Sequence, residues 1–431
     1  MFTILISALA CIGTITVTLI KPQIKVKDYD LSIFFFPAVI GALILIVFGD
    51  LSWDVVISGL TANTDINPLK ILLLFLSMTL LSVFLDETGF FRYLANFAVQ
   101  RCGGSQKKMF IIFYCMVSAL TIFTSNDVVI LTFTPFICYF SKNAMIDPIP
   151  FLVSEFVAAN TASTLLIIGN PTNIYLGTMA GIDFLSYLKV MYLPTIFSVI
   201  MAFVVLFCIF FRKLKLPLIT TTVKVVINQK KMLTFSLAVL SLCTMMLTIS
   251  NYLKLPMWLI SAMGLGTLTF GAILFSIVKF RKPSELINTI CRTPWEVIPL
   301  VLSMFIIVLA LENSGTTELI ANLFNTKNTI INYGIGSTLA ANLMNNIPMS
   351  VLFSSLVNVS GQDISATFAA VIGSNIGAYL TPIGALAGVM WLGILRRQGI
   401  KFSFLKFVMY GSCVAIPTLS AALFGLYLVL K

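Results

Sequence analysis

At 431 residues, 59% of them hydrophobic and only 10% charged, the chain has too few charges to cover the surface of a water-soluble protein. It contains no histidine, which excludes His-ligated zinc sites, Ser-His-Asp triads and haem ligation by histidine. The net charge of +11 comes from Lys and Arg between apolar runs rather than along one polar face, so it does not indicate nucleic-acid binding. The composition predicts a polytopic membrane protein.

The eight cysteines are scattered, mostly within apolar runs, and no CxxC pair occurs. They indicate neither a disulfide framework nor a metal site, and we expect them to be small packing residues. The first Lys is Lys21, so Phe2–Ile20 is expected to be a retained membrane span rather than a signal peptide.

Two of the apolar runs have lengths that do not suit simple membrane spans. Each is long for one helix of about 20 residues and short for two, which favours re-entrant hairpins at 109–141 and 328–362. The full set of runs is Phe2–Ile20, Leu31–Gly49, Ile71–Leu85, Met109–Ser141, Phe156–Ile182, Val190–Phe211, Met232–Leu253, Leu255–Val278, Val297–Leu311, Asn328–Gln362, Ile364–Leu395 and Phe407–Leu430.

Counting each hairpin as no crossing and each other run as one crossing predicts about ten transmembrane helices. The basic loops then fall on one side of the membrane, at 21–30, 86–108, 141–149, 212–231, 279–296 and 396–406. They contain 22 of the 27 Lys and Arg, so that side is expected to be the cytoplasm of a cell-membrane protein, with both termini extracytoplasmic.

The two halves of the chain resemble each other. Residues 76–89 align without gaps to 302–315, and 158–177 align to 369–388. Because five crossings separate the starts of the two copies, the second copy enters the membrane from the opposite face. An inverted repeat with interrupted helices is typical of secondary transporters whose site lies near the bilayer midplane.

These observations predict an all-α polytopic membrane protein with two re-entrant hairpins and two interrupted helices in an inverted-topology repeat. We expect four units along the chain. They are a peripheral N-terminal transmembrane pair at 1–67; repeat 1 at 68–211, with its hairpin at 109–141 and interrupted helix at 150–182; a cytoplasmic loop and connecting transmembrane pair at 212–293; and repeat 2 at 294–431, with its hairpin at 328–362 and interrupted helix at 364–395.

Each half has two places where polar or helix-breaking residues interrupt an apolar run. Proline removes a helical N–H and disrupts the preceding turn, which would leave a half-helix N-terminus for an anion and bare carbonyls for a cation. Ordinary kinks satisfied by neighbouring helices are the alternative, but four clusters paired by a repeat favour a binding site. The candidate residues are Ser125, Asn126, Asp127, Gly169, Asn170, Pro171, Thr172 and Asn173 in the first half, and Asn345, Asn346, Ser374, Asn375, Thr381, Pro382 and Gly384 in the second.

Asp127 is the ionisable residue that the topology predicts deep in the membrane. Such acids usually serve as a cation ligand, a proton carrier or a partner to substrate, although an Asp can also cap a half-helix at a wet hairpin tip. We expect a coupling ion, H⁺ or Na⁺, and no cofactor or resident metal. Sodium would bind at Asn126, Asp127 and Asn170.

Other acids lie near the predicted span ends, where water can solvate them. Asp86, Glu87 and Glu312 correspond by position in the two halves, and Glu155 lies near the cytoplasmic start of its span. The segment FFRYLANFAVQR spaces Phe90, Tyr93, Leu94 and Phe97 at helical intervals, which indicates an interfacial amphipathic helix that links core to frame.

Four motifs resemble the ion transporter superfamily, and most closely its arsenite permease (ArsB) group. They are SNDVVILTFTPF (125–136), IGNPTN (168–173), MNNIPMS (344–350) and IGSNIGAYLTPIGALAGVMWLGIL (372–395). The IGNPTN motif is also similar to dicarboxylate and anion permeases, and Asp127 to the NhaD sodium/proton antiporters. The resemblance implies two re-entrant hairpins, two interrupted helices and a central site between them.

We therefore expect an ArsB-like permease that moves a small anion or metalloid oxyacid, most of all arsenite or antimonite outward. An NhaD-type Na⁺/H⁺ antiporter or a di- or tricarboxylate permease of the same superfamily are the alternatives. An enzyme is not expected, since Asp127 would have no second deep acid and HExxH needs histidine. The expected partners are a small inorganic or organic anion and the lipid bilayer, with no nucleic acid; a homodimer and an ArsA-like ATPase subunit stay open.

Overall fold

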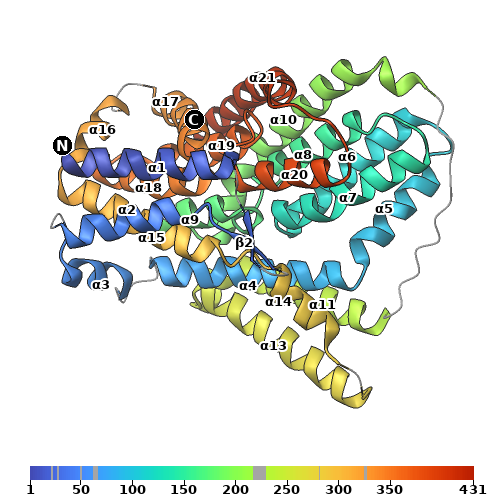
Figure 1. Ribbon diagram of the computed structural model, residues 1–431, viewed down its shortest axis with the longest axis horizontal. Helices are drawn as coiled ribbons and strands as arrows, with labels where there is room; N and C mark the ends of the chain where they lie inside the picture. Colours follow the sequence, from blue (N-terminus) through green and yellow to red (C-terminus); the bar gives the residue numbers. More distant parts are fainter. Residues whose placement is uncertain are drawn as a thin grey trace.

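A computed structural model describes residues 1–20, 23–26, 29–48, 51–61, 67–216, 230–280, 282–324 and 328–431. Most of the predicted basic loop at 212–231 lies outside these residues, as do parts of the loop at 21–30. The described chain is almost entirely helical (Figure 1).

The repeat is visible as the same series of helices in each half. A long helix is followed by a short connecting helix, two hairpin helices, two half-helices and a final helix of 27 residues that contains a proline, Pro194 or Pro417. In the first half these are α4 (Pro68–Glu87), α5 (Phe90–Arg101), α6 (Gln106–Phe123), α7 (Asn126–Asn143), α8 (Ile149–Ala162), α9 (Pro171–Met179) and α10 (Phe184–Phe210). In the second they are α15 (Val297–Asn313), α16 (Thr316–Phe324), α17 (Thr329–Met344), α18 (Asn346–Ser360), α19 (Ile364–Gly377), α20 (Leu386–Arg397) and α21 (Phe404–Leu430).

The remaining α-helices and the two strands precede the first repeat or connect the two repeats; short 3-10 helices follow α8 (Ile167–Gly169) and α10 (Lys213–Lys215). The leading segment contains α1 (Phe2–Ile20), β1 (Gln23–Val26), β2 (Tyr29–Ser32), α2 (Phe36–Val47) and α3 (Trp53–Thr61). The connection contains α11 (Lys230–Thr248), α12 (Ser250–Leu253), α13 (Met257–Val278) and α14 (Ser284–Arg292). The strands β1 and β2 pair antiparallel, with Gln23 opposite Ser32, where the sequence predicted only a loop.

Seven helices of the described chain are long and apolar enough to cross a membrane. One of them is α6, the first arm of the hairpin, and four shorter apolar helices include α1, α2, α8 and α19. The last two are short because the chain breaks after them, so each interrupted helix consists of two half-helices. The predicted fold class, an all-α polytopic membrane protein with hairpins and interrupted helices, is confirmed.

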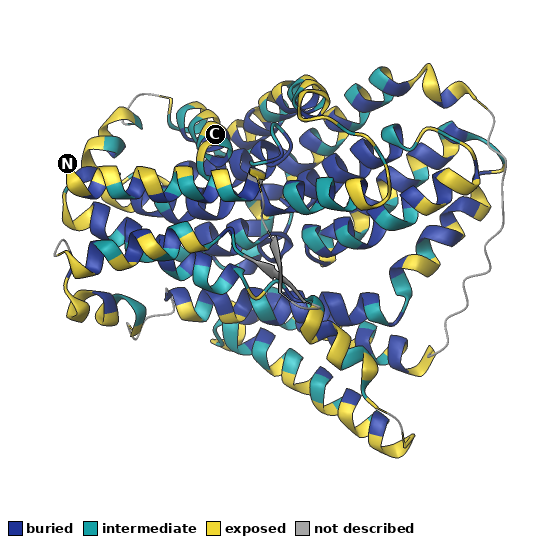
Figure 2. Cartoon of the chain, in the orientation of Figure 1, coloured by how far each residue is buried: buried dark blue, intermediate teal, exposed yellow. Residues whose placement is uncertain are grey.

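The repeats interlock at the centre of the molecule. Within each repeat the first hairpin helix packs on the first half-helix, α6 on α8 and α17 on α19. Between the repeats, α9 packs on α18 and α20 packs on α7, while α10 lies along α21. Buried residues are therefore concentrated centrally, and the outer faces of α3 and α13 are exposed (Figure 2). Each interruption thus lies beside the other repeat's hairpin.

Helix α5 forms where an amphipathic helix was predicted, but a different face is buried. Phe91, Ala95 and Ala98 are buried, whereas Tyr93 and Phe97 are 41% and 43% exposed. The apolar pattern could not reveal this because lipid-facing and core-facing side chains are both apolar in a membrane protein.

Candidate functional site

The first hairpin turns through two extended residues. Helix α6 ends at Phe123, and α7 begins at Asn126, whose amide Nδ2 donates to Asn160 Oδ1 on α8 at 3.0 Å. Ser125 Oγ and Asn126 Oδ1 are buried and have no hydrogen-bond partner. Asp127 is half-buried in the first turn of α7 and forms no hydrogen bond with any group that the structure describes. The tip therefore presents several oxygens that no protein donor satisfies.

The first interruption is built from local chemistry. Helix α8 ends at Ala162, and α9 begins at Pro171, a residue suited to the first helical position because its missing N–H needs no partner there. Asn170 caps α9: its Oδ1 accepts from the Thr172 N–H and hydroxyl, both at 3.1 Å. A Cβ on Gly169 would collide with the Ser163 carbonyl oxygen, so the break requires glycine there.

A side chain from the second repeat completes this interruption. Asn375 on α19 is fully buried, and its Oδ1 accepts from Ser163 Oγ at 2.9 Å and Asn170 Nδ2 at 3.0 Å. Its Nδ2 donates to Asn173 Oδ1 at 2.6 Å and to the Val371 carbonyl at 2.9 Å. One amide thus joins both repeats at the broken helix, which we call the Asn375 network.

The second interruption is held mainly through the backbone. Asn345, which caps α18, donates from Nδ2 to the Ile383 carbonyl at 3.1 Å, and the Asn346 N–H donates to the Gly384 carbonyl at 3.0 Å. Thr381 Oγ1 donates to Asn342 Oδ1 at 2.6 Å. These contacts fix the second hairpin tip to the break between α19 and α20.

Asn345 occupies a strained backbone conformation, with φ of 77° and ψ of 152°. This region is essentially restricted to glycine and costs on the order of 1–3 kcal/mol for other residues. The side-chain bonds to Ile383 and to the Ile347 N–H offset the cost.

The predicted residues therefore gather in three places. The tip of the first hairpin contains Ser125, Asn126 and Asp127. The Asn375 network contains Asn170, Asn173 and Asn375, and Gly169, Pro171 and Thr172 shape the same break. The third place contains Asn345 and Asn346 at the second hairpin tip, with Thr381, Pro382 and Gly384 in the break between α19 and α20. Ser374 is fully buried next to Asn375, and its hydroxyl has no partner.

The three residues named for sodium differ in how far their polar atoms are already hydrogen-bonded. Both groups of the Asn170 amide are occupied, by the α9 cap and by Asn375, whereas Asn126 and Asp127 retain unbonded oxygens. Ser125 Oγ lies beside them in sequence and is also unbonded. Within the described residues, no three His, Cys, Asp or Glu side chains form a cluster that could hold a metal ion.

Sequence reasoning missed several participating residues. Asn160 and Asn342 hold the hairpins to the interrupted helices, and each is a polar residue inside an otherwise apolar run. Glu155 was expected near a solvated span end, but it is 1% exposed and accepts hydrogen bonds from Thr134 Oγ1 at 3.0 and 3.1 Å. Its depth depends on how α7 and α8 pack, which the sequence did not reveal.

Another acid expected at a solvated span end is also buried. Asp86 is 4% exposed and pairs with Arg292 Nη2 of α14 at 2.7 Å, and Glu87 pairs with the same guanidinium. In the second repeat, the matching acid Glu312 accepts a hydrogen bond from Ser355. These contacts tie the ends of α4 and α15 to neighbouring helices.

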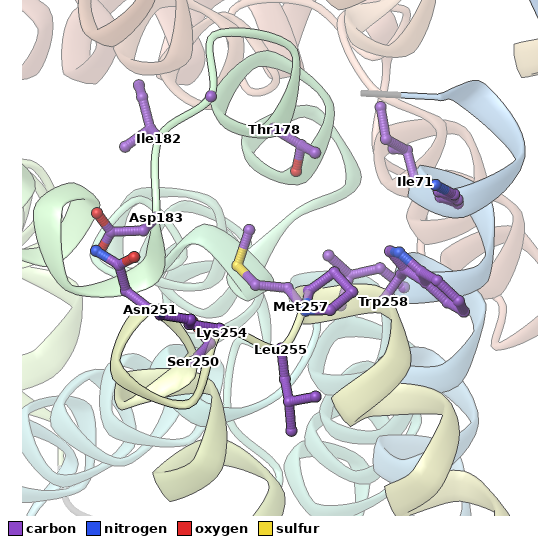
Figure 3. Close-up of a pocket in the computed structure, with 14 residues that line it drawn as sticks. Ile71, Thr178, Ile182, Asp183, Ser250, Asn251, Lys254, Leu255, Met257 and Trp258 are labelled. Atoms are coloured by element: carbon purple, nitrogen blue, oxygen red, sulfur yellow. The ribbon is translucent and has the colours of Figure 1, made fainter. Parts of the chain in front are cut away.

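A cavity of about 420 Å³ lies away from these clusters (Figure 3). It is bounded by the start of α4, the α9–α10 junction and the α12–α13 segment. Asp183 and Asn251 lie at one side and Trp258 at the other, with Lys70 about 5.6 Å from the Trp258 ring centroid. It contains none of the predicted site residues.

Comparison with known proteins gives this geometry a family. Residues 33–368 match the CitMHS family, described as citrate transporters. The chain belongs to this family. A family of membrane transporters accounts for the paired hairpins and broken helices, and it supports a transporter rather than an enzyme.

Individual relatives carry the name arsenical pump membrane protein. One from Escherichia coli is 27% identical over 82% of this chain and 85% of its own length. A putative arsenical pump membrane protein of Bacillus subtilis is 25% identical over 86% of this chain and 89% of its own. The resemblance to the arsenite permease group is confirmed, and the chain is a polytopic membrane transporter of the ArsB/CitMHS permease type.

A solved structure shares the fold. The Alcanivorax borkumensis YdaH transporter, described as having an unusual topology, superposes with a TM-score of 0.58. The match covers 99% of this chain and 97% of that protein at 14% sequence identity. At this identity the likeness concerns the fold alone.

Proposed function

We propose that this chain is a secondary active transporter that moves a small anion or metalloid oxyacid, with arsenite or antimonite efflux as its activity. The names of the relatives support a metalloid substrate. The observation that carries the proposal is the first hairpin tip, where Ser125 Oγ and Asn126 Oδ1 are buried without partners beside Asp127. Buried polar groups without partners are costly, and a ligand that hydrogen-bonds to them would remove that cost.

The chemistry of the polar clusters fits a neutral hydroxylated substrate. Arsenous acid is uncharged at neutral pH, and each of its hydroxyls both donates and accepts hydrogen bonds. Amides and hydroxyls can do the same. The cationic residues of α7 and α20 lie only at their C-terminal ends, at Lys142, Arg396 and Arg397, and α8, α9, α18 and α19 contain none. A polycarboxylate would need cationic partners that these helices do not supply.

Coupling to H⁺ or Na⁺ is part of the proposal, with Asp127 linking ion binding to transport during alternating access. A second candidate, an NhaD-type Na⁺/H⁺ antiporter, is supported by the same unbonded oxygens, which are the kind of ligand that sodium prefers. A carboxylate permease, which the family description suggests, is the third.

Transport by the full chain in proteoliposomes tests this proposal. Uptake of arsenite, antimonite and citrate is measured under imposed pH and Na⁺ gradients for the wild type, Asp127→Asn and Asn126→Ala. We expect metalloid transport that falls at least about tenfold in both variants, equivalent to about 1.4 kcal/mol. Asp147→Asn, which changes a carboxylate paired with Lys213 outside the clusters, is the control. Wild-type metalloid flux in both variants would refute the assignment of the site. Transport of citrate alone would select the carboxylate permease, and Na⁺/H⁺ exchange alone would select the antiporter.

The proposed orientation places both termini outside the cytoplasm. It is supported by the concentration of Lys and Arg in the loops on one side. Labelling of tags at Met1 and Lys431 by a membrane-impermeant reagent in intact cells tests it, and protection of both tags would reverse the topology.

A further inference from the structure

Glu155 is a carboxyl group on α8, which packs against α7, and α7 in turn packs against α20. Its side chain is 1% exposed, and the hydroxyl of Thr134 is the hydrogen-bond donor to both of its oxygens. Trp391 of α20, itself 1% exposed, covers this region and contacts Phe156 with ring centroids 5.2 Å apart. The carboxyl is therefore closed off from water in this state.

No described cation faces Glu155. The titratable group that interacts with it is the Cys138 thiol on α7. On α6 and α10, the buried Tyr114 and Tyr187 donate their hydroxyls to backbone carbonyls, and α19 carries no titratable side chain. Asp127 lies at the opposite end of α7 from Lys142. The other charged residues of α6, α7, α10 and α20 are exposed or half-buried near helix ends: Lys107, Lys108, Lys142, Lys189, Arg396 and Arg397.

The second repeat has no acid at the equivalent position. The alignment that pairs Ser163 with Ser374 pairs Glu155 with Ala366, which is fully buried in α19. A methyl group therefore meets the packing needs of this position in one repeat. The carboxyl of Glu155 in the other repeat therefore adds an ionisable group that packing does not require.

Glu155 is mechanically connected to the candidate site. Helices α7 and α8 are joined by side chains at two levels, Asn126 to Asn160 at the tip and Thr134 to Glu155 further along. Eight residues of helix separate the two levels on α7, about 12 Å. An ionised carboxylate without a cation is costly in such a dry contact, so ionisation favours separation of α7 from α8 and admission of water. Movement of the hairpin and charge on Glu155 are thereby linked.

We propose that Glu155 carries the proton that is exchanged for substrate, an inference that rests on the proposed transport function. In the closed α7–α8 contact the carboxyl holds one proton, and its O–H bond breaks when the contact opens to water, leaving one carboxylate. Reprotonation from the other side of the membrane closes the contact again. One proton per cycle crosses the membrane on Glu155. Asp127, which the proposed function links to ion binding, then holds the substrate or a sodium ion at the tip rather than the proton.

The test separates coupling from transport in proteoliposomes that contain the full chain, with the membrane potential clamped. For one coupled proton, a gradient of one pH unit supports up to about tenfold metalloid accumulation. We expect Glu155→Gln to reduce this ratio to about one while metalloid exchange at equal pH persists with a flat pH profile. Asp147→Asn is the control and should keep both activities.

If Glu155→Gln still accumulates metalloid in response to the pH gradient, the proposal is overturned. It is also overturned if Glu155→Gln loses metalloid exchange at equal pH as fully as it loses accumulation while its melting temperature is unchanged. If Glu155→Gln fails to fold, Glu155→Asp decides: coupled transport with a shifted pH profile supports the proposal, and a wild-type profile overturns it. If the wild type moves no metalloid, the proposed substrate fails separately. Proton flux driven by a Na⁺ gradient, with the same variants, then tests Glu155.

Discussion

The two interruptions perform the same structural task with a different balance of side-chain and backbone hydrogen bonds. In the first, the Asn375 network joins side-chain amides of both repeats, with Asn170 and Asn173 as direct partners. In the second, Asn342 and Asn345 donate to backbone carbonyls of their own repeat. Backbone acceptors are present whatever the side chains are, whereas an amide network fails when one member is removed. The first interruption should therefore be more sensitive to substitution.

The hairpin tips differ in a corresponding way. Asp127 in the first tip corresponds to Asn346 in the second, and Glu155 corresponds to Ala366. The first tip is extended and unstrained, while the second contains Asn345 at positive φ. The repeats thus share a framework, but the membrane-embedded acids of the hairpin and interrupted helix belong to the first. This difference is the reason that the proposed ion coupling is placed in repeat 1.

The largest effect is expected from Asn375→Ala. It removes the acceptor of Ser163 and Asn170 and the donor to Asn173, and each buried group left unpaired costs about 1–3 kcal/mol. We expect loss of transport and a clear fall in melting temperature in detergent. Asn342→Ala, the comparison in the second interruption, should lower the melting temperature less. Equal losses in the two variants would remove the distinction between the interruptions.

A smaller effect is expected from adding one methyl group at each break. In Gly169→Ala the Cβ would collide with the Ser163 carbonyl, and in Gly384→Ala with the Gly377 carbonyl. Overpacking of this kind costs about 1–3 kcal/mol, so both variants should melt earlier and transport less. Gly266→Ala in α13 is the matched control because its Cβ meets no atom within 4 Å. It should be neutral or stabilising by about 1 kcal/mol.

Exchanging the tip residues tests whether the acid must lie in repeat 1. Asp127→Asn alone should lower transport at least about tenfold. The double variant Asp127→Asn/Asn346→Asp restores the number of acids but places the carboxyl at the strained tip. We expect it to remain impaired in transport assays, with a melting temperature close to that of Asp127→Asn. Recovery of wild-type flux would show that the tips are equivalent.

The smallest effect is expected at Asp183, which caps α10 outside the membrane span. Burial raises the pKa of Asp183, but hydrogen bonds from Ser186 and Leu185 outweigh it and leave the pKa below its ordinary value of 3.8. Its ionised form therefore stabilises the fold above that value, and the contribution is lost as pH falls through the lowered pKa.

Asp183→Ala should cost about 1 kcal/mol near neutral pH, measured as a lower melting temperature. The difference from wild type should shrink at acidic pH. Asp183→Asn keeps a capping oxygen and should remove most of the pH dependence. A constant difference across pH would contradict the assignment.

The sequence by itself determined the framework of this protein. Run lengths predicted the hairpins, and the alignment of the halves predicted the repeat. Pro171 and Gly169 marked the first break. These features are local: apolar length and the chemistry of proline and glycine act within a short stretch of chain, wherever that stretch lies.

Only the tertiary structure decided which polar groups meet and which acids are buried. Asn375 finds Asn170 and Asn173 because α19 packs on α9 across the repeats. Glu155 is enclosed because α7, α8 and α20 converge on it. In a membrane protein both core-facing and lipid-facing surfaces contain many apolar side chains, so apolar periodicity alone does not show which face packs inward. That choice is made by contacts between residues far apart in the chain.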